Sequence, residues 1–235
     1  MHNQTLIHNQ KTGLLDSIKE VVFGLEDGMV STLGAITGIA VGTHNHATVI
    51  LSGLVIIAVE SISMGVGVFL SDSSAKDLDN RKIKEEEFEI TNYPDKEKAE
   101  LKIFYQQDGW PEQLAGQMSV VASQNRKLLL KEMMTRELKI FSTPPQSLKK
   151  GLVMFAAYVL GGLIPLLPYF FIALPKAIYL SIGCALLGLF VLGAAIGKIS
   201  LNFWLASALK MLILGGVALS VGLLMSQISQ KFIAS

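Results

Sequence analysis

The second half of the chain limits the fold more than any other feature, because no acidic residue occurs from Gly151 to Ser235. Three long apolar stretches lie there: Gly151–Pro175, Ala177–Gly197 and Asn202–Ile228, the last broken only by Lys210. A helix needs about 20 mostly apolar residues to cross the hydrocarbon core of a bilayer. The sequence therefore predicts three membrane-spanning helices, and their lack of acidic residues indicates a scaffold rather than a place for chemistry.

Two stretches in the first half, Val21–Thr43 and Ala47–Ser71, are also long enough to cross a bilayer, although they contain Glu26, Asp27 and Glu60. Only 17% of all residues are charged and 51% are hydrophobic. Soluble domains carry about 25% charged residues. The predicted fold class is thus an all-α membrane protein with five transmembrane helices.

The charges gather between Asp72 and Lys150, a region that holds 14 of the 20 basic and 14 of the 19 acidic residues. Strong helix formers dominate this region, and Pro94 and Pro111 interrupt it. This pattern predicts three helices, the third running from Glu112 to Ile140. The predicted organisation is residues 1–71 with transmembrane helices 1 and 2, a three-helix cytoplasmic domain over residues 72–150, and residues 151–235 with transmembrane helices 3 to 5.

The lysines predict the orientation in the membrane, since Lys and Arg are enriched on the cytoplasmic side. Lys11 and Lys19 precede the first span, and the polar region follows the second. We therefore expect the N-terminus and residues 72–150 in the cytoplasm, and the C-terminus on the opposite side. The membrane would be the cell inner membrane in a prokaryote and a vacuole-like membrane in a eukaryote.

Composition disfavours several function classes. The net charge of +1 gives no basic field for nucleic acid. The single cysteine, Cys184, permits neither an intrachain disulfide nor a cysteine metal cluster. Residues 72–150 contain no histidine, so the Glu-x-x-His pairs of di-iron helical enzymes are missing. We expect neither an enzyme nor an organic cofactor.

The first predicted span carries acids on one face. Asp16, Glu20 and Asp27 are four and seven residues apart, which places them within roughly 40° of one another on a helix, whereas Glu26 falls away from that face. A carboxylate inside a bilayer is costly, so such residues usually face a wet cavity and mark a pathway. In the alternative interpretation, Asp16 and Glu20 are interfacial and Glu26 and Asp27 lie at the membrane edge.

The second predicted span places Glu60 and Met64 one helical turn apart. A thioether beside carboxylates favours Fe²⁺ and similar transition ions over Mg²⁺ and Ca²⁺, which prefer oxygen alone. The alternative is that Met64 is an ordinary core residue. Because one pair of helices cannot line a wet pore, a two-fold dimer is expected, with the two lines of acids facing each other.

The polar region has acids at helical spacing. Glu86 and Glu89, like Glu97 and Glu100, are three residues apart and share a helix face. With Glu137, and with sulfur from Met133 or Met134, they could form a divalent-metal site. Lysines interleave with these acids, and spacing alone favours a solvated helix face.

Taken together, these residues resemble the vacuolar iron transporter family of membrane Fe²⁺/Mn²⁺ transporters, and the resemblance covers essentially the whole chain. The matching segments are Val22–Gly28, Ser63–Gly67 with Leu70 and Ser71, Asn92–Pro94 through Glu97, Glu100, Tyr105 and Gly109, and Met133–Met134 with Glu137 and Leu138. Three positions depart from the family pattern: Glu26 replaces an asparagine, Val68 a common glutamate, and Met134 a further metal-binding glutamate of some members.

The resemblance implies a homodimer that exchanges metal for protons across the membrane, with the ion path between the first two helices of each protomer. It implies metal ligands at Asp27 and Met64 in the membrane and cytoplasmic-side acids at Asp16 and Glu20. The metal ligands that it implies in the polar domain are Glu86, Glu89, Glu97, Glu100, Met133 and Glu137.

The function expected is transport of Fe²⁺ or Mn²⁺ out of the cytosol, driven by proton antiport. Carboxylates suit this exchange, because the same oxygens bind either a proton or a metal ion. The expected ion pathway includes Asp16, Glu20, Glu26 and Glu60. The alternative is a membrane-tethered divalent-metal sensor or buffer that does not transport, although such a protein would not need Asp27 inside the membrane.

Overall fold

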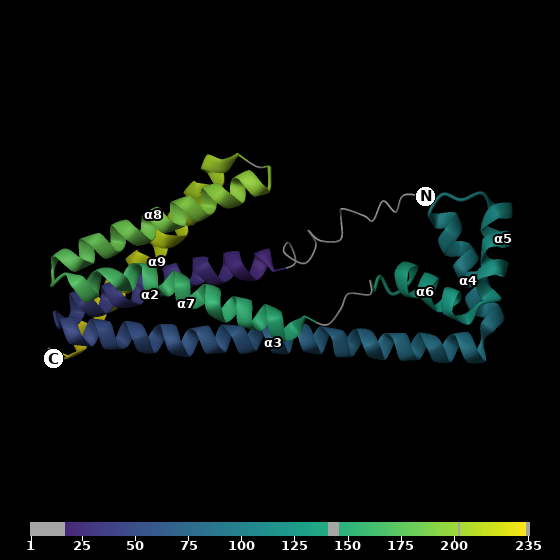
Figure 1. Cartoon of the computed structure of the whole chain (residues 1–235), viewed down its shortest axis with the longest axis horizontal. Coiled ribbons are helices and arrows are strands. Elements are labelled where there is room, and N and C mark those ends of the chain that lie inside the picture. Colours follow the sequence, from purple (N-terminus) through teal and green to yellow (C-terminus); the bar gives the residue numbers. More distant parts are fainter. Residues whose placement is uncertain (1–16, 141–145, 202, 234–235) are drawn as a thin grey trace, which may run out of the picture. The chain divides into compact units, whose positions relative to one another are not determined.

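The computed structural model describes residues 17–140, 146–201 and 203–233, and within these ranges the chain forms helices and no strand (Figure 1). The helices of the described residues are α2 (Ile18–Thr43), α3 (His46–Asn92), α4 (Pro94–Gln107), α5 (Glu112–Ser123), α6 (Arg126–Arg136), α7 (Ser147–Phe171), α8 (Lys176–Ile199) and α9 (Trp204–Ile233). The chain divides into two compact units. We refer to residues 1–69 and 147–235 as the membrane unit, and to residues 70–146 as the polar unit.

Four helices of the described residues are long and apolar enough to cross a membrane: α3, α7, α8 and α9. The helix α2 is 26 residues long, but Glu20, Glu26 and Asp27 interrupt its apolar sequence and it is not among these four. The structure thus supports an all-α membrane protein.

Within the membrane unit, α2 packs against α7, α8 and α9. The contact with α7 is so close at Gly28 that a Cβ atom there would overlap the backbone oxygen of Tyr158. On the other side of α2, a Cβ on Gly34 would lie 2.8 Å from the backbone oxygen of Ala218 in α9. Glycine therefore lets α2 run between two neighbours at backbone distance.

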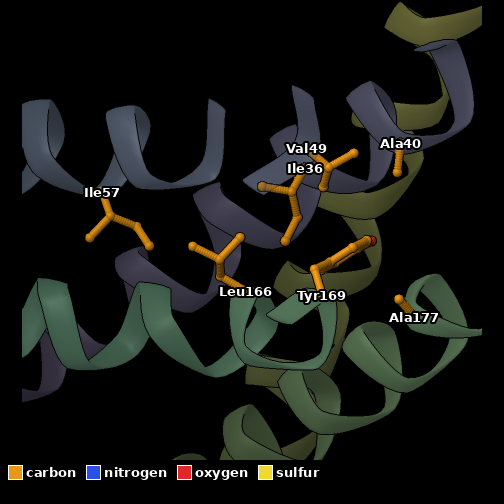
Figure 2. Close-up of a cluster of buried hydrophobic side chains, with 7 residues drawn as sticks. All are labelled: Ile36, Ala40, Val49, Ile57, Leu166, Tyr169 and Ala177. Carbon is orange, nitrogen blue, oxygen red and sulfur yellow. The ribbon is translucent and has the colours of Figure 1, made fainter. Parts of the chain in front are cut away.

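An apolar cluster holds the membrane unit together at the end of α2 (Figure 2). Its buried side chains come from α2, α3, α7 and α8: Ile36, Ala40, Val49, Ile57, Leu166, Tyr169 and Ala177. The largest of them, Tyr169, has no exposed surface. Its backbone oxygen also contacts Nε2 of His46, at the start of α3.

The polar unit contains the end of α3 together with α4, α5 and α6. The prediction of a single helix from Glu112 to Ile140 is wrong, because the chain turns at Gln124 and Asn125 and begins a new helix. The Asn125 side chain caps that helix by accepting hydrogen bonds from the backbone nitrogens of Lys127 at 3.1 Å and Leu128 at 3.3 Å. The expected three-helix count therefore does not describe this unit.

Candidate metal centre

Carboxylates meet in the polar unit where α3 ends and α4 begins. Glu86 and Glu89 lie one turn apart on α3, Glu97 lies in the first turn of α4, and only Tyr93 separates the two helices. Pro94 begins α4 at a position where its missing N–H costs nothing. This tight connection brings one carboxylate oxygen from each of the three glutamates within 4.8 Å of the others.

Two of these glutamates are buried. Glu97 has no exposed surface and Glu86 is 3% exposed. Among the described residues, neither oxygen of Glu97 has a hydrogen-bond partner, and the same holds for Oε1 of Glu86 and Oε2 of Glu137. A buried carboxylate without a partner is costly while it is charged. These groups must therefore hold protons or bind a cation.

Two further acids, Glu100 and Glu137, interact electrostatically with this group of glutamates. Burial raises the pKa of Glu86 to about 8, and the neighbouring charges of Glu137 and Glu97 add to the effect. Burial raises the pKa of Glu97 and of Glu137 as well, and in both cases Glu100 is the next largest cause. Glu89 also contributes to both shifts. Glu89, Glu100 and Glu137 are thus each close enough to Glu97 for their charges to raise its pKa.

Met133 lies one turn before Glu137, whose backbone nitrogen donates to the Met133 oxygen at 2.9 Å. The Met133 side chain is fully buried, in an apolar core that also contains Leu101, Tyr105 and Leu129. The structure therefore places Met133 in the core of the polar unit, beside the helix end that carries Glu137. Its role as a sulfur ligand stays a prediction.

The sequence analysis missed Arg136, which borders the cluster. Its guanidinium lies 4.5 Å from the centre of the Tyr105 ring, and its Nε is 2.9 Å from Oε2 of Glu132. It also pairs with Asp108, just after α4. Arg136 thus ties the end of α6 to α4 and neutralises Glu132, one of the acids near Glu137. The four-residue spacing of Glu132 and Arg136 was the available signal.

In the membrane unit, the structure joins Glu60 to two hydroxyl groups. Oε2 of Glu60 accepts a hydrogen bond from Ser31 Oγ at 3.0 Å and another from the hydroxyl of Tyr158. Ser31 lies on α2 and Tyr158 on α7, so three helices meet at this carboxylate. The sequence analysis did not predict this contact, since the first stretch after Gly151 was expected to be scaffold, and that expectation stays a prediction. The sequence feature that could have indicated this contact is the tyrosine hydroxyl of Tyr158 within an otherwise apolar predicted span.

The remaining predicted pathway residues lie on α2 and α3. Asp27 is close enough to Glu60 for the two carboxylates to repel, and Glu26 is its chain neighbour. Glu20 is half-buried in the first turn of α2. Met64 is half-buried one turn beyond Glu60, and Asp16 lies outside the described residues.

Comparison with known proteins gives a consistent result over most of the chain. The VIT family matches residues 18–227. Vacuolar iron transporter 1 of Tulipa gesneriana is 30% identical over 218 residues, which cover 92% of this chain and 88% of that protein. Vacuolar iron transporter 1 of Oryza sativa subsp. japonica is 31% identical over 203 residues, or 86% and 81% of the two chains. The protein of the same name from Arabidopsis thaliana is 28% identical over 91% of this chain and 86% of its own length.

Proposed function

The chain belongs to the VIT family, and on that premise we propose that it is a multi-pass membrane transporter that moves Fe²⁺ and Mn²⁺ out of the cytosol by proton antiport. The relatives named above are vacuolar iron transporters. The single observation that carries the proposal is the cluster of Glu86, Glu89 and Glu97, whose oxygens converge within 4.8 Å. Three carboxylates at this distance, two of them buried, suit a divalent cation.

The helix α2 is the fifth span in this proposal. It is long enough to cross a bilayer and packs against α7, α8 and α9, which are apolar enough to do so themselves. Its acids, Glu26 and Asp27, are then intramembrane charges, which normally serve a pathway. The N-terminus and the polar unit lie in the cytoplasm, as the lysines predict.

The polar unit collects ions from the cytosol. Glu86, Glu89, Glu97, Glu100 and Glu137 supply oxygen ligands, and Met133 supplies sulfur. Because each carboxylate must lose its proton to bind a metal ion, binding releases protons. The same exchange at a second group of acids can couple metal movement to a proton gradient.

The membrane unit supplies that second group. Asp27 and Met64 bind the ion, and Asp16, Glu20, Glu26 and Glu60 line the route. A second copy of the chain completes the pore, with the acids of two α2 helices facing each other across a two-fold axis. Met64 adds a soft ligand that favours Fe²⁺ over Mg²⁺ and Ca²⁺.

Ion flux into proteoliposomes that contain a pH-sensitive dye tests this function. We expect uptake of Fe²⁺ and Mn²⁺ together with counter-movement of protons, and faster uptake when the lumen is acidic. Glu87→Gln is the control for variants of the glutamate cluster, since Glu87 is exposed and adjacent to Glu86 on the same helix. A protein that binds Mn²⁺ but gives no flux above empty vesicles would be a metal sensor or buffer instead.

A further inference from the structure

Tyr158 of α7 is a buried polar residue of the membrane unit that the proposed ion route does not yet use. Its side chain has no exposed surface. Its hydroxyl donates to Oε2 of Glu60 and also contacts Oγ of Ser31. Ser31 donates to the same Glu60 oxygen at 3.0 Å. One oxygen of Glu60 is therefore held by two hydroxyls, and these hydroxyls contact each other.

Close helix packing brings the three groups together. Gly28 and Gly161 are two of the positions where α2 and α7 touch, since a Cβ at either would overlap the backbone oxygen of Tyr158 or of Leu25. A larger residue at these sites would push α7 outward. At this distance, the Tyr158 hydroxyl contacts both Ser31 on α2 and Glu60 on α3. The hydrogen bonds thus depend on glycine at the contact between α2 and α7.

The hydrogen bonds to Glu60 counteract the electrostatic repulsion between its carboxylate and that of Asp27. Asp27 lies near enough to repel it, and a free glutamate side chain would rotate away. Hydrogen bonds to a charged carboxylate are roughly twice as strong as those between neutral groups. Two donors on Oε2 hold the side chain in one orientation and leave Oε1 unengaged by either hydroxyl.

We propose that Tyr158 is a positioning residue of the ion route, which together with Ser31 tethers Oε2 of Glu60 and leaves Oε1 for the transported ion or proton. This inference rests on the proposed transport function. It assigns a function to α7, a helix without an acidic residue. It also makes the route depend on three helices, α2, α3 and α7, rather than on the first two alone.

The test is Tyr158→Phe, which keeps the ring and its packing and removes only the hydroxyl. We expect the kcat for Fe²⁺ uptake to fall about fivefold, as for the loss of one hydrogen bond, with the melting temperature in detergent unchanged. Tyr169→Phe is the matched control, because Tyr169 is equally buried on the same helix and its hydroxyl lies outside the Glu60 contacts. It should leave uptake at the wild-type rate.

Ser31→Ala removes the other hydroxyl that donates to Glu60. It tests the positioning of Glu60 even if Tyr158→Phe fails to fold. Alone it should reduce uptake about twofold, because the Tyr158 tether remains. The double variant should lose more than the product of the two single losses, since both hydroxyls hold one oxygen. A double loss equal to that product, or a Tyr158→Phe rate equal to that of Tyr169→Phe, would overturn the inference. Absence of flux in the wild type would instead overturn the proposed transport itself.

Discussion

The two units of the molecule both gather carboxylates, but they build their clusters in opposite ways. In the polar unit, Glu86, Glu89 and Glu97 come from a short segment folded at one tight turn, and Oε1 of Glu86 and both oxygens of Glu97 are buried without a hydrogen-bond partner among the described residues. In the membrane unit, Glu60 is held by Ser31 and by Tyr158, which is 98 residues away in sequence. The first cluster contains buried oxygens without such partners, whereas in the second the hydroxyls of Ser31 and Tyr158 hold one oxygen of Glu60.

This difference separates two tasks. A cluster whose carboxylate oxygens lack partners is stabilised by a cation that binds them, so it suits the capture of ions. A carboxylate whose orientation is already set by neighbours pays no reorganisation when an ion arrives, so it suits passage through a defined geometry. Loss of a residue should therefore weaken binding in the polar unit and slow transport in the membrane unit.

The largest effect is expected from Asp27→Asn, which keeps the shape of the side chain and removes its charge. Metal flux in proteoliposomes should be abolished, while Mn²⁺ binding to the polar unit, measured by calorimetry, should be unchanged. Glu87→Gln serves as the active control. Wild-type flux in Asp27→Asn would remove this residue from the pathway, and weakened binding would mean that the two clusters are not separate.

The next effect is expected from Glu97→Gln in the full-length protein. Replacing a buried ligand with a neutral amide should weaken Mn²⁺ binding about tenfold or more, which corresponds to about 1.4 kcal/mol. Calorimetry with Mn²⁺ and Mg²⁺ side by side measures this, and only the Mn²⁺ response should be strong. Equal and weak binding of both ions in the wild type would leave a solvated acidic surface in place of a metal centre.

A smaller effect on transport is expected from Met64→Leu. The exchange conserves volume and apolarity, so it should cost less than about 1.5 kcal/mol of stability. If the sulfur is a ligand, Fe²⁺ uptake should fall about fivefold relative to wild type, because a soft ligand is lost. Uptake and ion preference equal to wild type would make Met64 a packing residue.

The smallest effect concerns the pH dependence of stability without metal. The pKa of Glu86 is about 8 in the folded protein against an ordinary value of 4.5, so between these values the folded state keeps a proton that the unfolded state releases. Stability from this group is therefore full below pH 4.5 and is lost as the pH rises through about 8. In EDTA, the melting temperature should fall between pH 6 and pH 8.5, roughly tracking this titration.

Two comparisons sharpen that measurement. Glu86→Gln should flatten the decline, because the amide does not titrate, whereas Glu87→Gln should leave the slope as it is. Saturating Mn²⁺ should reverse the slope, since a deprotonated cluster binds the metal more tightly. A melting temperature that rises with pH in EDTA would contradict the raised pKa.

The sequence predicted the helical nature of the chain, but it did not predict that Glu86 and Glu97 are buried. Spacing placed Glu86 and Glu89 on one face, yet interleaved lysines favoured a solvated surface. Burial arises from the turn at Tyr93, which folds α4 back so that Glu97 reaches the other two. Such a reversal depends on tertiary packing, which spacing along one helix does not record.

Two other features escaped prediction for different reasons. The break before α6 has neither glycine nor proline, and its one signal was Asn125, a good helix cap within a helix-forming segment. The contact of Tyr158 with Glu60 depends on how closely α7 approaches α2. The local sequence therefore indicates the helix break at Asn125 only weakly, and it hardly indicates the contact between Tyr158 and Glu60.

The chain positions of the two clusters also set the order in which they can form during synthesis. Glu86, Glu89 and Glu97 leave the ribosome together, and the small loop between them closes at little entropic cost. Glu60 must wait until α7, which begins at Ser147, has been made before the hydroxyl of Tyr158 can reach it. A nascent chain can therefore bring Glu86, Glu89 and Glu97 together while Glu60 still lacks its Tyr158 partner, and the membrane unit is complete only after α8 and α9, which also pack against α2, have been made.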